Sequence, residues 1–119
     1  MALEGYNCIM VDPELMAACA PIIPEEVKTV GKATGAEFTG DETPEEIGKK
    51  TADAIRALMK KCGIKHPREY GMEREQFINC AKMAAEIDFG LRLNCVLDVV
   101  GENREAVIAD IYAKTYDNY

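Results

Sequence analysis

Tryptophan is absent from this 119-residue chain, histidine occurs once, and aromatic residues make up only 7% of the sequence. So few rings argue against a stacking surface for single-stranded nucleic acid, whose bases pack on aromatic side chains. Basic residues are also in deficit, since 14 Lys and Arg stand against 21 Asp and Glu and give a net charge of −7. A surface of that sign repels phosphate backbones, and we therefore expect no nucleic-acid partner.

Long apolar runs and targeting signals are missing as well. No apolar window approaches the ~18 residues that a membrane span requires. A secretory signal begins with a basic region, but the stretch from Met1 to Tyr6 contains neither Lys nor Arg. Asp12 and Pro13 then interrupt the apolar segment that follows. We expect a cytoplasmic protein that does not associate with membranes.

The cysteines do not follow a metal-binding or disulfide pattern. They are odd in number, widely spaced, and lack both a CxxC pair and a paired histidine: Cys8, Cys19, Cys62, Cys80 and Cys95. Zinc and iron–sulfur sites use other spacings. We expect reduced thiols that pack as small hydrophobic groups.

Catalytic motifs are also missing, because no GxGxxG, P-loop, GxSxG or HExxH pattern occurs. His66 lies in a basic connector, where we expect an exposed turn histidine rather than a general base. The adjacent acids Glu25–Glu26 and Glu45–Glu46 stand at expected helix starts, where the helix dipole accounts for them. Asp88 follows an apolar helix face, and we expect it to cap a turn, with a polar group aimed at a cleft as the alternative.

Proline, glycine and the spacing of apolar residues predict a series of helices. The first runs from near Leu3 to near Asp12, with Pro13 opening a further turn. A second helix starts at Pro24 and ends by Gly35.

The best-marked helix is the third in the chain. It begins at a capping box, in which the Thr43 hydroxyl accepts from the Glu46 backbone and the Glu46 carboxylate reaches back, and it ends at Gly63. Its predicted buried stripe is Ile47, Thr51, Ala54, Ile55, Leu58, Met59 and Cys62, and that of the second helix is Val27 and Val30.

The second half of the chain predicts two more helices. Pro67 is expected to start a single turn, Met72 or Glu73 a fourth helix, and Asn103 a last one, with residues 96–100 as a short strand or an apolar loop. The predicted buried faces are Phe77, Cys80, Ala81, Ala84, Ile87 and Leu91 in the fourth helix, and Val107, Ile108, Ile111 and Tyr112 in the last. We therefore predict one all-α domain over residues 1–119, packed as a helical bundle.

Four segments share a further pattern of order and spacing: Glu4-Gly5 to Pro13, Pro24 to Gly35, Ala52 to Gly63-Ile64, and Asp88 to Asn94. Together they resemble the C-terminal helical domain of the iron-containing alcohol dehydrogenase family, which is a dehydroquinate synthase-like α-domain. The family has a His-Gly segment, a proline-led helix, an AxxAIxxLxxxxGIP helix and a D-x-C-x-x-x-N-P stretch in this order. Gly90 and Cys95 depart from the last motif.

The resemblance implies a parent enzyme that uses NAD(P) and iron to interconvert alcohols and aldehydes. Family members hold iron with one Asp and three His, and Glu4 replaces the last of these histidines. The other ligands and the nucleotide-binding domain would lie upstream. We therefore expect no catalytic, cofactor-binding or metal-binding residue in this chain.

Two functions remain as expectations from the sequence. The first is a detached or excised C-terminal domain of such an oxidoreductase, inactive alone and paired with a nucleotide-binding domain. The second is a free-standing helical interaction or oligomerisation module without enzymatic activity, which associates through an apolar face.

Overall fold

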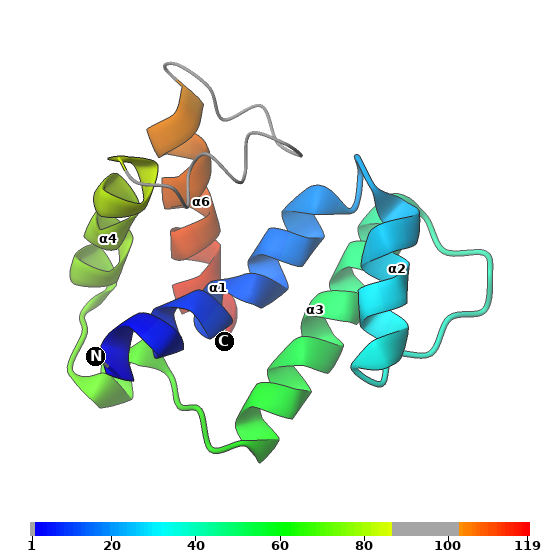
Figure 1. The fold of residues 1–119 in the computed structure, drawn as a ribbon, viewed down its shortest axis with the longest axis horizontal. Coiled ribbons are helices and arrows are strands. Elements are labelled where there is room, and N and C mark those ends of the chain that lie inside the picture. Colours follow the sequence, from blue (N-terminus) through cyan, green and yellow to red (C-terminus); the bar gives the residue numbers. More distant parts are fainter. Residues whose placement is uncertain (1, 87–102) are drawn as a thin grey trace. The chain divides into compact units, whose positions relative to one another are not determined.

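A computed structural model describes residues 2–86 and 103–119, and side chains are described for 10–81 and 105–119. Within these ranges every regular element is helical, as the sequence predicts (Figure 1). The elements are α1 (Ala2–Cys19), α2 (Pro24–Ala33), α3 (Pro44–Lys61), the 3-10 turn η1 (Pro67–Tyr70), α4 (Arg74–Glu86) and α6 (Asn103–Asn118). Residues 96–100, predicted as a short strand or an apolar loop, lie outside the described residues.

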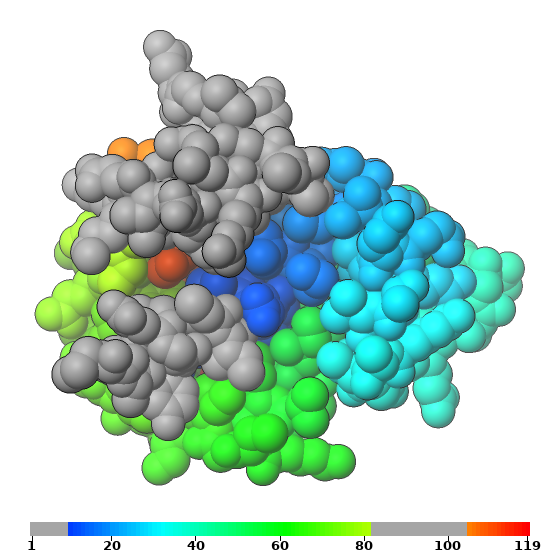
Figure 2. Space-filling view, viewed as in Figure 1, coloured from blue at the N-terminus to red at the C-terminus, as the bar shows by residue number. Residues whose placement is uncertain are grey.

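These elements belong to two compact units, Met1–Ile64 and Lys65–Tyr119. In the first unit, α3 packs against both α1 and α2. The space-filling view shows side chains of α1, in blue, against those of α2, in cyan (Figure 2). In the second unit, α4 packs against α6. That residues 1–119 make one domain stays a prediction.

The predicted helix starts are confirmed in the first unit. Pro24 stands in the first turn of α2 with Glu25 and Glu26 beside it. At α3 the backbone N–H of Glu46 donates to the Thr43 hydroxyl at 3.2 Å. The Glu46 carboxylate accepts from that same hydroxyl, also at 3.2 Å, where the sequence predicts a bond to the Thr43 backbone. Both helices therefore begin where local capping chemistry places them.

The ends of α2 and α3 use one common device. Gly35 and Gly63 take positive φ angles of 106° and 81° directly after the C-cap residues. The next amide then reaches back to a carbonyl of the last turn, from Ala36 to Gly31 at 2.8 Å and from Ile64 to Met59 at 3.0 Å. These are Schellman motifs, which glycine permits because it lacks a Cβ.

The predicted break at Asp12 is wrong, because α1 continues through Pro13 to Cys19. An interior proline removes one backbone hydrogen bond and costs about 3 kcal/mol relative to alanine. Pro13 is fully buried, and its neighbours Val11 and Glu14 are buried as well. Packing around Pro13 therefore offsets the cost of an interior proline, from which the sequence predicted a helix break.

The predicted buried stripe of α3 is correct in direction but not in extent. Its buried members include Ile47, Thr51, Ile55 and Met59, and the structure adds Gly48 and Ala52, whereas Ala54 is only half-buried. Leu58, by contrast, is 45% exposed, and Cys62 is exposed. Burial of Leu58 and Cys62 was therefore a wrong prediction.

Helix length explains this difference. Helices α2 and α3 begin at the same end of the first unit (Figure 1), and α2 has ten residues against 18 in α3. At 1.5 Å per residue, α3 extends about 12 Å beyond α2. Leu58 and Cys62 continue the row of Thr51, which meets α2 through a hydrogen bond to the Val27 carbonyl at 3.3 Å. Leu58 and Cys62 therefore lie on the part of α3 that α2 is too short to cover.

Val30 of α2 is a second correction, because it is 38% exposed while Val27 is buried as predicted. Helix α2 meets α3 through Val27 and Gly31. Gly31 lies so close to Thr51 that no side chain fits between them. The contact face of α2 is therefore centred on Val27 and Gly31, and Val30 lies beside it.

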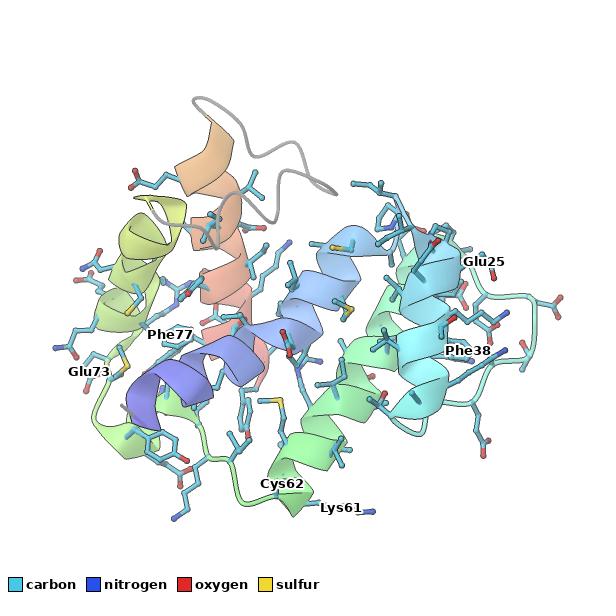
Figure 3. The ribbon with its side chains drawn as sticks, viewed as in Figure 1. Glu25, Phe38, Lys61, Cys62, Glu73 and Phe77 are labelled. Carbon is cyan, nitrogen blue, oxygen red and sulfur yellow. The ribbon has the colours of Figure 1, made fainter. Side chains whose placement is uncertain are left out.

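The core of the second unit is aromatic. Phe77 projects from α4 (Figure 3). The centroid of its ring lies 5.2 Å from that of Tyr112 and 5.9 Å from that of Tyr116, both on α6. Ala81, Ile108, Ile111, Tyr112 and Tyr116 are buried around it. Phe77, Ala81, Ile108, Ile111 and Tyr112 confirm the predicted faces, whereas Cys80 and Val107 are only half-buried. Predictions for Ala84, Ile87 and Leu91 lie outside the described side chains.

Candidate functional site

His66 is not the exposed turn histidine that the sequence predicts. Its side chain is half-buried, with Nε2 2.8 Å from the Tyr116 carbonyl oxygen. Nδ1 accepts a hydrogen bond from the Arg68 backbone N–H at 3.0 Å. Because Nδ1 accepts, Nε2 carries the proton and donates to Tyr116. Both ring nitrogens are hydrogen-bonded, and through Nδ1 the imidazole caps the start of η1.

The end of α6 is tied to η1 and α4 by further polar contacts. The Tyr116 hydroxyl donates to the Met72 carbonyl at 3.1 Å. The Arg74 guanidinium donates to both carboxylate oxygens of Asp117 at 2.9 Å. The hydrogen bonds from Arg74 lower the pKa of the Asp117 carboxyl, and the Asp117 carboxylate raises the pKa of the Arg74 guanidinium. Both side chains are about half exposed, so the pair contributes little to stability.

A buried ion pair lies inside the first unit. The Arg56 guanidinium of α3 donates to the Glu14 carboxylate of α1 and, at 3.0 Å, to Asp53. Glu14 is only 8% exposed. A buried carboxylate requires such a partner, because removal from water is costly for a lone charge. The pair fixes α1 against α3.

Asp12, two residues earlier in α1, is half-buried, and burial raises the pKa of its carboxyl. Such a group can serve as a general acid when other chemistry converges on it. Across the part of the chain that the structure describes, however, no three His, Cys, Asp or Glu side chains gather to hold a metal ion. The carboxyl by itself defines no reaction.

The loop between α2 and α3 is fastened by Glu42. Its carboxylate accepts from the Thr39 backbone at 2.7 Å, from the Gly40 backbone at 3.0 Å and from the Lys50 ammonium at 2.6 Å. The Lys50 bond, followed by the Thr39 bond, lowers the pKa of the Glu42 carboxyl far below its ordinary value. The sequence analysis did not predict these contacts of Glu42, although the turn-forming residues Thr39 to Glu42 before Thr43 indicate such a turn.

Phe38 belongs to the same loop and lies beside α2 (Figure 3). The ammonium groups of Lys28 and Lys50 each lie 5.7 Å from its ring centroid, within the range of cation–π attraction. The ring also approaches Gly31, where a Cβ atom would be only 2.8 Å from Phe38 Cζ. These lysines therefore stabilise the loop.

The described cysteines are free thiols. Cys19 is buried and Cys80 half-buried, and burial raises the pKa of both thiols. A raised pKa disfavours the reactive thiolate, as expected of thiols that fill space. Five residues named in the sequence analysis have side chains outside the described set, so the predictions for them remain untested: Glu4, Cys8, Asp88, Asn94 and Cys95.

The exposed residues Leu58 and Cys62, which we call the α3 end patch, form the candidate interaction surface of the first unit. Figure 3 shows Cys62 and Lys61 at the end of α3 that extends past α2. Leu58 is the apolar part of the patch, and Lys61 is exposed beside it. The paired acids Glu25–Glu26 and Glu45–Glu46 are exposed at helix starts, as predicted.

None of the described helices is both long and apolar enough to span a membrane. Comparison of the chain with protein-family models, with curated proteins and with solved structures found no significant match. The resemblance to iron-containing alcohol dehydrogenases therefore rests on the quoted residues and stays a prediction.

Proposed function

We propose that this chain is the helical half of an oxidoreductase that resembles the iron-containing alcohol dehydrogenases, and that it has no activity alone. The complete enzyme would transfer hydride between a nicotinamide cofactor and an alcohol or aldehyde. A nucleotide-binding domain, on a separate or preceding segment, would supply the cofactor site and the iron ligands. The chain would act in the cytoplasm, where free thiols such as Cys19, Cys62 and Cys80 are usual.

One observation carries this proposal, namely the order and the ends of the helices. Helix α1 contains the Glu4-Gly5 to Pro13 segment, α2 begins at Pro24, and α3 ends at Lys61, directly before Cys62 and the Gly63-Ile64 pair. The resemblance requires a helix end at that last position, and the glycine with positive φ is the device that makes one. The single turn η1 and then α4 come after α3 in the chain.

The described charged side chains fit a structural contribution. Arg56 and Glu14 hold α1 against α3, and Lys50 and Glu42 hold the loop before α3. Glu4 stands where the family carries a histidine ligand, and a carboxylate is a suitable oxygen ligand for a hard divalent ion. One ligand does not make a metal site, so the proposal assigns none to this chain.

The test starts from the DNA upstream of the coding segment. If that DNA encodes a nucleotide-binding segment with Asp and His ligands, the two chains are produced together, loaded with ferrous iron and given NAD(P)⁺ and short alcohols. We expect absorbance from reduced nicotinamide only when both chains are present, with each chain alone as the control. Activity of the 119-residue chain alone with iron, or upstream DNA without such a segment, would overturn the proposal.

A second candidate function is a free-standing helical module that self-associates, and the α3 end patch favours it. Leu58 is 45% exposed on the row of α3 that also carries the buried Thr51. Covering the rest of that side chain is worth about 1 kcal/mol, whereas a micromolar complex needs about 8 kcal/mol. The patch would therefore be one part of a larger contact.

Light scattering over a range of concentrations tests this second function. We expect the unaltered chain to form a concentration-dependent oligomer that Leu58→Ser weakens. Ile22→Ser is the matched control, because Ile22 is 53% exposed in the turn between α1 and α2 and lies off the patch. Equal helicity of all three proteins by circular dichroism shows that folding is intact. A chain that is strictly monomeric at every concentration contradicts self-association.

A further inference from the structure

We draw no further inference here: the strongest candidate, the α3 end patch of Leu58 and Cys62 beyond the end of α2, already serves the second proposed function, and nothing in the structure shows what covers it.

Discussion

Replacement of Gly31 by alanine tests the close contact between α2, α3 and the loop that carries Phe38. A Cβ at this position would lie 2.5 Å from the Thr51 hydroxyl oxygen and 2.8 Å from Phe38 Cζ. Atoms do not approach so closely, so at least one neighbour must move. The Thr51 hydroxyl is buried and donates to the Val27 carbonyl at 3.3 Å, and its displacement would break that bond.

The expected loss of stability follows from one favourable and two unfavourable contributions. Alanine in place of glycine within a helix gains about 1 kcal/mol from backbone propensity. Overpacking of a tight contact costs about 1–3 kcal/mol. A buried hydroxyl that loses its partner costs about 1–3 kcal/mol more. Phe38 is half-buried and can swing outward, so we take the lower part of these ranges and expect a net loss of about 2 kcal/mol.

Urea unfolding, followed by far-ultraviolet circular dichroism, measures this loss. With a slope of about 2 kcal/mol per molar urea, the unfolding midpoint of Gly31→Ala should fall by about 1 M. The exposed helix substitution Lys32→Ala is the control and should change stability by less than about 0.5 kcal/mol. In a Thr51→Ala background, Gly31→Ala should cost less, because the nearest clashing atom is gone. A Gly31→Ala protein at least as stable as its parent would refute the reasoning.

Three other predictions follow from contacts in the same structure. Glu42→Gln should destabilise the protein at pH 7. Because the pKa of Glu42 is lowered in the folded state, the loss of unfolding free energy should be complete above about pH 5 and should shrink as the pH falls. Glu45→Gln is the control in the same unfolding series. Arg56→Met should cost about 2–4 kcal/mol in urea unfolding, because the buried Glu14 carboxylate loses the guanidinium. Adding Glu14→Met should recover part of the lost stability. Equal stability of the single and double variants would contradict a buried ion pair. Phe77→Ala should cost about 3–5 kcal/mol by removing the ring that packs against Tyr112 and Tyr116 between α4 and α6. Asp117→Asn, in the exposed pair with Arg74, should change stability far less, and similar losses for both variants would show this ranking to be wrong.

Helix ends were the features that sequence reasoning predicted best. Thr43, Pro44 and Glu46 lie within four residues of one another, and Gly63 needs only its own backbone freedom to end a helix. Capping depends on such near neighbours, which any single sequence displays. The same reasoning placed η1 at Pro67.

The residues that looked chemical in the sequence were harder to interpret. His66 contacts the Tyr116 carbonyl 50 residues away, and no local pattern predicts that distance. Arg56 and Glu14 are separated by 42 residues, so neither looked exceptional in its own helix. The Glu42 anchor is local, but its partner Lys50 lies on the next helix. For His66, Glu14 and Arg56, partners far along the chain decided what the side chain does.

The sequence by itself determined that the described chain is helical and where most helices begin and end, because propensity and capping act over a few residues. Tertiary structure alone decided that α1 passes through the buried Pro13, that Leu58 stays exposed where α2 has ended, and that the described helices gather into two units. An apolar stripe records which side of a helix can be buried. Whether it is buried depends on the length and position of its neighbour, which are properties of distant sequence.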